Sequence, residues 1–285
     1  MNQTQIAIEI FNALFNEEQR NELSNCQLTD VVENCHSTED VENRQPSFPE
    51  NFPGEINNPV LSDGYGEHVI QAEEVKGTPI ILGEYTPMNS PGVITFYKEN
   101  IKKYSGSLMR KVVNSGVSLG LDTVLFTIYF VVEDIMKHES FHYYCDYKRR
   151  LTLAQYDHDK EEALAVAHSY KEMDAWHTFY HAFMHGSPYN DFFSNYFHSG
   201  PNVQLCKKRM ETIFKVLKEE HYKGYTLPGY SDWNKYIGTN SYNTHYYDYL
   251  KNETLDTLLG NGVPVNDIFW EINHLENKGA IIQLK

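Results

Sequence analysis

A chain of 285 residues with 41% hydrophobic residues is long enough to bury one sizeable core with appended segments. Its net charge of −15 argues against nucleic acid or an anionic membrane as the main partner. The sequence has no apolar run near transmembrane length, no secretory signal at its start and no CxxC spacing among its four cysteines. We therefore expect a reduced, cytoplasmic protein.

The first 66 residues differ in composition from the rest of the chain. Residues 1–50 carry ten acidic residues against Arg20 and Arg44, and residues 44–66 are rich in proline, glycine and asparagine. The pattern predicts a short amphipathic helix within residues 6–23, followed by an extended linker. Because like charges repel, we expect this helix to be loosely attached and not part of the core.

Strand-like and helical patterns follow in that order. The runs at residues 68–72, 79–83 and 92–97 are β-like and are bounded by glycine or proline. They predict a small sheet whose edge strand can hold an extended peptide by main-chain pairing. Helical patterns cover about residues 98–118, 121–148, 160–185 and 202–222, with two more stretches between 255 and 278. A last strand is expected at residues 280–284, which gives an α+β fold class.

The pentapeptide His-Glu-Ser-Phe-His at residues 138–142 lies inside the second helical pattern. Residues four apart share one face of a helix, so His138 and His142 can point at a single metal ion. Glu139 lies about 100° round the helix from His138 and can instead reach a water molecule on that ion. Two neutral imidazoles beside a carboxylate are the groups that zinc-assisted hydrolysis requires.

The same helix also fits a protein without metal. Its residues Val131, Ile135, His138, His142 and Cys145 form one stripe. Two buried, hydrogen-bonded histidines would extend the apolar stripe, with Cys145 as a small core residue. The pentapeptide alone leaves this alternative open.

A third ligand is needed, because catalytic zinc sites usually have three protein ligands and one open position. The alanine-rich segment 160–167 carries Glu161 and Glu162 in the first turns of a predicted helix, which Asp157 or Asp159 can cap. The small residues after Glu162 would let this helix pack closely against the first. Alternatively, both glutamates are solvated acids at a helix N-terminus.

Taken together, the pentapeptide and Glu162-Ala163-Leu164-Ala165 resemble the gluzincin pattern of zinc peptidases, HExxH followed by ExxA. The segment 91–97 is similar to the strand that precedes the metal helix in small bacterial zincin-like peptidases. The resemblance covers residues 80–170. It implies that Zn²⁺ is bound by His138, His142 and Glu162 and that Glu139 is the general base. Glu162 is preferred to Glu161 because alanine follows it three residues later.

The sequence departs from thermolysin-like gluzincins at the residue that orients a ligand histidine. Those enzymes place an aspartate four residues beyond the ligand glutamate, where this chain has Val166. Asp134 and Asp146, one turn before His138 and one turn after His142, are candidate replacements, and so is a backbone carbonyl.

A group that stabilises the transition state is also sought among nearby polar side chains. The candidates by proximity are Tyr143, Tyr144, His168 and Tyr170. A second series, His177, His181 and His185, can bind another metal or supply that donor. Because no carboxylate or cysteine has matching spacing, half-buried, hydrogen-bonded histidines are the favoured interpretation of this series. A tyrosine-rich stretch over residues 225–249 suits either a half-wet cleft or the boundary of the core.

The sequence therefore predicts an α+β, zincin-like domain with a small N-terminal sheet, a metal-binding helix and a mainly helical C-terminal part. Residues 1–66 are the acidic segment and linker, and residues 67–285 form the domain, with its metal core over 80–185 and a helical subdomain over 186–285. The expected function is zinc-dependent hydrolysis of a peptide or protein substrate. The alternatives are a non-catalytic, zincin-fold binding or regulatory protein with structural zinc, and a helical interaction protein without metal.

Overall fold

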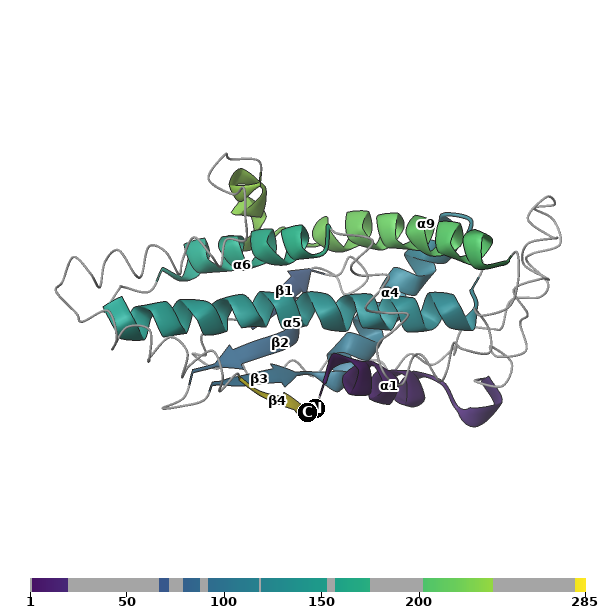
Figure 1. Ribbon diagram of the computed structural model, residues 1–285, viewed down its shortest axis with the longest axis horizontal. Coiled ribbons are helices and arrows are strands. Elements are labelled where there is room, and N and C mark those ends of the chain that lie inside the picture. The colour runs from purple at the N-terminus through teal and green to yellow at the C-terminus, as the bar shows by residue number, and fades with distance from the viewer. Residues whose placement is uncertain are drawn as a thin grey trace.

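The computed structural model of the chain describes residues 2–19, 67–71, 79–87, 92–117, 119–152, 157–174, 202–237 and 280–285. A long helix, α5 (Leu121–Thr152), runs through the middle of the described structure (Figure 1). Most of a small sheet and α1 (Gln3–Leu14) lie below α5 in this view, and α6 (His158–Glu172) and α9 (Asn202–Tyr222) lie above it. The fold class is α+β and mainly helical, as the sequence predicts.

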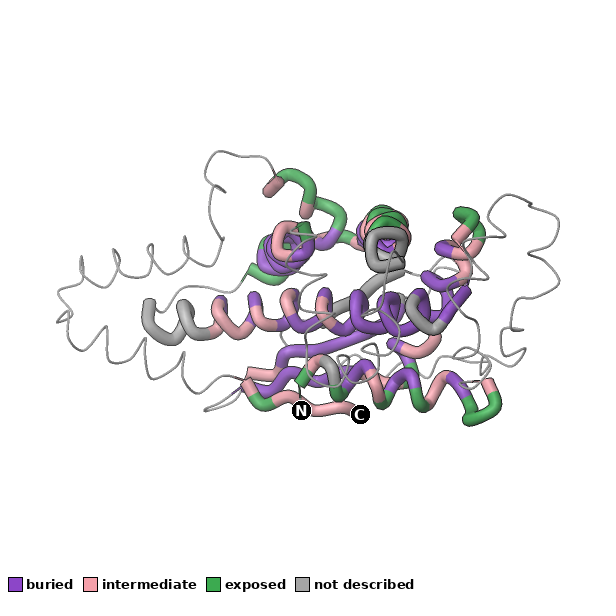
Figure 2. The backbone as a smooth tube through the Cα atoms, turned by 45° about the vertical axis from the view of Figure 1, so that its right-hand side comes forward, coloured by how far each residue is buried: buried purple, intermediate pink, exposed green. Residues whose placement is uncertain are grey.

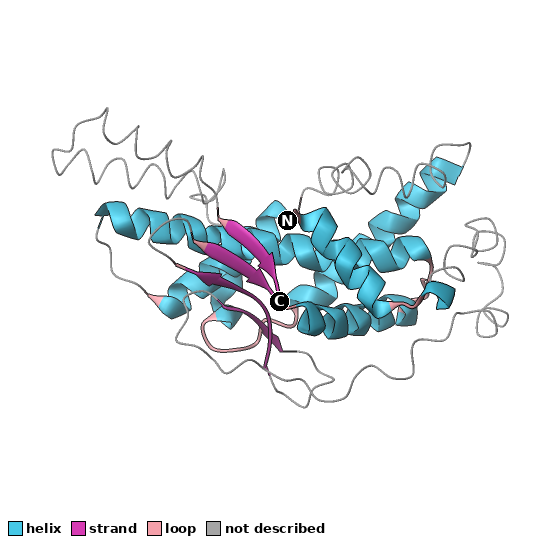
Figure 3. Ribbon diagram, turned by 90° about the horizontal axis from the view of Figure 1, so that it is seen from below, coloured by secondary structure: helices cyan, strands magenta, loops and turns pink. Residues whose placement is uncertain are grey.

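The sheet has four strands in the order β1 (Glu67–Gln71), β2 (Pro79–Thr86), β3 (Val93–Phe96) and β4 (Ile281–Leu284). The first three strands form antiparallel pairs, and β4 pairs in parallel with β3. The C-terminal strand therefore returns to the N-terminal hairpins, as Figure 3 shows from below. All four strands are predicted by the sequence, but the pairing of β4 with β3 is not.

Helix α5 is buried on all sides over most of its first half (Figure 2). Because neighbours cover every face of this part of the helix, most of its side chains are apolar. Its fully buried side chains include Val124, Phe126, Ile128, Phe130, Val131, Val132 and Ile135. Neither α5 nor any other helix of the described ranges is apolar over a length sufficient to cross a membrane.

Helix α1 belongs to the main hydrophobic core, so the expectation of a loosely attached N-terminal helix is wrong for residues 3–14. Ile6, Ala7 and Ile10 have no exposed surface and share one apolar cluster with α5. A capping box of Asn2 and Gln5 fixes the start of the helix. The physical reason is local composition: α1 contains one acidic residue, Glu9, so charge repulsion does not oppose the burial of its apolar face.

Helix α6 is placed by its cap and by its small residues. The side chain of Asp157 accepts a hydrogen bond from the backbone N–H of Lys160 at 3.2 Å, which confirms the predicted helix start. Ala163, Ala165 and Ala167 are at most 1% exposed, and they allow α6 to pack closely against α5. Helix α6 ends at Glu172, and the predicted continuation beyond residue 174 lies outside the described residues.

Helices α4 (Lys98–Asn114) and α9 complete the bundle around α5. The buried side chain of Asn100 donates a hydrogen bond to the backbone oxygen of Ile81 at 2.7 Å, which ties α4 to β2. The side chain of Arg209 in α9 donates to Thr123 near the start of α5 at 2.7 Å. These contacts tie α4 to the sheet and α9 to the start of α5.

Candidate metal centre

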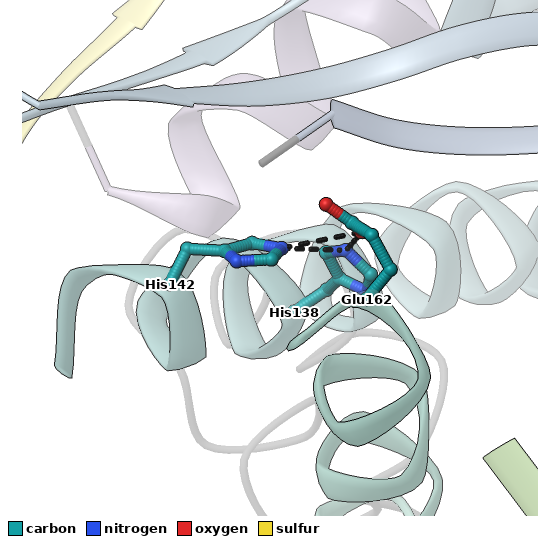
Figure 4. Close-up of side chains that lie close together, drawn as sticks. All are labelled: His138, His142 and Glu162. Carbon is teal, nitrogen blue, oxygen red and sulfur yellow. Dashed lines mark hydrogen bonds and ion pairs between the residues drawn. The ribbon is translucent and has the colours of Figure 1, made fainter. Parts of the chain in front are cut away.

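Three side chains from two helices converge on one point (Figure 4). His138 and His142 extend from neighbouring turns of α5, and Glu162 extends from the second turn of α6. The Nε2 atoms of the two histidines are 3.1 Å apart, and Oε2 of Glu162 lies 3.2 Å from the first and 3.4 Å from the second. The structure thus brings together the three residues that the sequence predicts as a ligand set.

The spacing of these donor atoms fits a metal ion. Bonds of 2.0–2.1 Å to a tetrahedral zinc ion place nitrogen and oxygen ligands about 3.3 Å apart. The three observed separations lie within about 0.2 Å of that value. The other carboxylate oxygen of Glu162, Oε1, is buried and has no hydrogen-bond partner among the described residues. A group of two imidazoles and a carboxylate so arranged can hold a divalent cation.

The electrostatics of the group favour positive charge at the same point. Burial lowers the pKa of His142, but the charge of Glu162 and the hydrogen bonds to Glu161 and Glu162 outweigh it and raise that pKa well above its usual range. Burial raises the pKa of Glu162, but His142 and His138 together lower it far below its usual range. The carboxylates therefore stabilise a cation beside the two histidines, and a metal ion can take that role.

Glu139, the predicted general base, is fully buried next to the strand β2. A Cβ atom built on Gly83 of β2 would lie 3.2 Å from Oε1 of Glu139. Because no side chain intervenes, the sheet approaches the metal helix closely at the residue that follows His138. The sequence shows Gly83 only as the end of a β-like run and gives no sign of this contact.

Glu161, the neighbour over which the sequence analysis prefers Glu162 as a ligand, also contacts one of the two histidines. Its Oε1 atom lies 2.9 Å from Nδ1 of His142, and the residue is 7% exposed. Glu161 is therefore not a solvated acid at the helix start. Its buried carboxylate lies at Nδ1 of His142, whereas Glu162 lies at Nε2 of the same ring.

The two aspartates that are candidates to orient the ligand histidines have hydrogen-bond partners outside the His-His-Glu group. Asp134 accepts hydrogen bonds from Tyr222 and Tyr225 and lies 2.7 Å from Nε2 of His221, where α5 meets the end of α9 and the residues that follow it. Asp146 accepts a hydrogen bond from the hydroxyl of Tyr85 at 2.9 Å. Helical spacing predicts that both aspartates lie near the site. Their carboxylates instead accept hydrogen bonds from tyrosine hydroxyls in distant parts of the chain.

The four candidates for stabilising the transition state contact different neighbours. The ring of Tyr143 lies edge-on to Tyr85, and the ring of His168 lies 5.4 Å from Phe141. Tyr170 faces α9, where the ammonium group of Lys218 sits 3.7 Å from its ring centre. Tyr144 lies against Tyr143. The series His177, His181 and His185 lies outside the described residues.

Tyr230 reaches the site from a segment that the sequence did not connect with it. It begins the 3₁₀ helix η2 (Tyr230–Tyr236), and its ring stacks on that of His138 with centroids 6.4 Å apart and an interplanar angle of 11°. Gly229 precedes it with a φ of 86°, and a Cβ atom there would lie 3.0 Å from Oδ1 of Asp159. Glycine is needed for both the conformation and the close approach, which bring η2 onto the start of α6.

Comparisons with known proteins add no relative. No protein-family model matches the chain, and neither the curated proteins nor the solved structures contain a match. The resemblance to gluzincins therefore consists of the short motifs and of the buried His-His-Glu group, which is compatible with an HExxH motif.

Proposed function

We propose that this chain is a zincin-like, zinc-dependent peptidase. The observation that carries the proposal is the meeting of His138, His142 and Glu162 at metal-ligand spacing, with Glu139 beside His138 on the same helix. A donor set of two neutral imidazoles and one carboxylate suits zinc better than calcium or magnesium, which prefer oxygen ligands.

The proposed chemistry divides between the ligands and Glu139. A bound zinc ion would supply a Lewis acid that polarises the substrate carbonyl and the attacking water. The carboxylate of Glu139 takes a proton from that water as the new C–O bond forms, and it returns the proton to the amine nitrogen as the C–N bond breaks. Its burial beside β2 keeps this carboxylate out of bulk water.

The substrate side of the proposal rests on the sheet. β1 is an outer strand of the described sheet, and its residue His68 pairs with Gly83, the residue that lies against Glu139. An extended peptide that pairs with the outer edge of β1 would therefore run alongside the strand pair closest to the general base.

The test combines metal content with peptide cleavage. Zinc per chain is measured on untagged protein for the wild type and for the variants His138→Ala, Glu162→Ala and Glu139→Gln, and each is incubated with a mixed peptide library read by mass spectrometry. We expect one zinc in the wild type and in Glu139→Gln, weakened binding in the other two variants, and cleavage by the wild type alone. A wild type that neither contains nor acquires zinc would refute the proposal.

A second candidate function is a non-catalytic protein with structural zinc. The observation that favours it is the burial of His138, Glu139, His142 and Glu162, each of which has no exposed surface. Structural zinc sites are closed, whereas catalytic sites keep one open position. In this case the wild type binds zinc but cleaves no peptide, and Glu139→Gln changes neither its zinc content nor its stability.

A further inference from the structure

The carboxylates of two consecutive residues contact opposite nitrogens of one imidazole. Glu161 Oε1 lies 2.9 Å from Nδ1 of His142, and Glu162 Oε2 lies 3.4 Å from Nε2 of the same ring. Neighbouring residues on a helix point about 100° apart, so both can reach the ring only if it lies across the first turns of α6. His142 is therefore held between the two side chains and has no exposed surface.

The contact at Nδ1 determines which nitrogen of His142 is free to bind a metal. A carboxylate is an acceptor, so the hydrogen atom of a neutral His142 resides on Nδ1 and is donated to Glu161. The lone pair then resides on Nε2, which faces Glu162 and His138. A carboxylate at this position also strengthens the imidazole as an electron donor to a metal.

The alternative explanation for Glu161 is its place in the first turn of α6, where acidic side chains favour the helix dipole. Asp159 occupies the same turn, and its side chain is 75% exposed, as that explanation requires. The side chain of Glu161 is only 9% exposed. Burial of a carboxylate is unfavourable unless a partner compensates it, and here the partner is His142.

We infer that Glu161 is the positioning residue of the metal centre, which holds His142 with Nε2 directed at the ion, while Glu162 alone of the two is a ligand. This inference rests on the proposed zinc site. The inference also explains why this chain can have valine at position 166, where thermolysin-like gluzincins have the aspartate that orients a ligand histidine. Here Glu161, the residue just before the ligand Glu162, supplies that carboxylate.

The test measures zinc affinity by competition with a chromophoric chelator. We expect Glu161→Gln to bind one zinc per chain with an affinity about 10–100-fold below that of the wild type. Asp159→Asn removes the same charge from the same turn without the contact to His142, and its affinity is expected to equal that of the wild type. Unfolding of the chelator-treated proteins is measured in parallel, to show that the variants fold.

A second measurement needs no variant. Nitrogen NMR of the zinc-loaded wild type is expected to show His142 protonated at Nδ1 and bound through Nε2. The inference is wrong if His142 carries its proton on Nε2, if Glu161→Gln binds zinc as tightly as the wild type, or if Glu161→Gln binds zinc as weakly as Glu162→Ala. A wild type that binds no zinc would overturn both the inference and the proposed function. The three results just named would overturn the inference alone, so the two failures are distinguishable.

Discussion

Gly83 in β2 lies directly against Glu139 in α5. A Cβ atom at Gly83 would fall 3.2 Å from Oε1 of Glu139 and 2.5 Å from Cγ2 of Ile135. The second distance is shorter than real Cβ contacts allow, so the approach of the sheet to this helix depends on the absence of a side chain. One residue thus sets both the packing of the core and the surroundings of the proposed base.

Replacing Gly83 by alanine is expected to destabilise the fold by about 1–3 kcal/mol, because the added methyl group overpacks the contact with Ile135. The ligands lie on other residues, so zinc content is expected to remain at one per chain while peptide cleavage falls through displacement of Glu139. Urea unfolding, zinc content and cleavage rate measure the three effects.

The control for this variant is a double-mutant cycle with Ile135→Ala, which removes the atom that the new methyl group meets. Gly83→Ala is expected to cost less stability in the Ile135→Ala background than in the wild type. Equal costs in both backgrounds would show that the contact between β2 and α5 does not limit packing at this point.

Zinc is expected to stabilise the folded chain, because the three donor atoms lie together only when α5 and α6 are packed. At free zinc of 100 times the dissociation constant, the gain in unfolding free energy is about 2.7 kcal/mol. Thermal unfolding with zinc and with a chelator measures it. His142→Ala is expected to abolish the difference, whereas His168→Gln, a change of another buried histidine, is expected to retain it. A wild type with the same midpoint in zinc and in chelator would contradict the site.

The meeting of His138, His142 and Glu162 could be predicted because short-range patterns place each of them on its helix. The spacing of His138 and His142 fixes a shared helix face, and Asp157 marks the start of the helix that carries Glu162. The role of Glu161 could not be predicted, because it depends on how α6 is rotated about its own axis against α5. Helical spacing gives the angle between Glu161 and Glu162, but only packing decides that the carboxylate of Glu161 lies at Nδ1 of His142.

The partners of Asp134 were beyond prediction for a different reason. Its position one turn before His138 suggests a role at the metal site, yet His221 and Tyr225 come to it from more than 80 residues away. Nothing in the sequence links these residues, because their contact arises from the packing of α9 against α5. The net charge of residues 1–50 does not predict the core position of α1, because α1 itself contains one acidic residue.

Asp134 is expected to be one of the residues most important for stability. It is fully buried and contacts His221, Tyr222 and Tyr225. Asp134→Ala leaves these donors without their acceptor and is expected to cost on the order of 3–5 kcal/mol. Asp146→Ala, on the same helix, is the matched control; Asp146 accepts a hydrogen bond from Tyr85, and its loss is expected to cost about 1 kcal/mol. Urea unfolding of both variants compares them, and similar losses would show that the Asp134 contacts contribute little.

The same buried cluster predicts a loss of stability in alkali. Tyr104 belongs to it, because its hydroxyl lies 2.8 Å from Nδ1 of His221. Burial, with the negative charge of Asp134 adding to it, raises the pKa of Tyr104, Tyr222 and Tyr225 well above the usual value. In the unfolded chain the three hydroxyls lose their protons near pH 10. The unfolded state then binds fewer protons than the folded state, so the stability present below about pH 10 is lost as the pH rises beyond it. Each tyrosine contributes up to about 1.4 kcal/mol per pH unit.

Urea unfolding at a series of alkaline pH values measures this slope, and tyrosinate absorbance of the folded protein shows which hydroxyls have titrated. Exposed tyrosines titrate alike in both states and do not contribute. Tyr225→Phe removes one buried hydroxyl from the cluster, so its stability is expected to fall less steeply above pH 10 than that of the wild type. If the folded wild type gains tyrosinate absorbance from all its tyrosines near pH 10 without losing stability, the cluster does not hold its protons as the structure indicates.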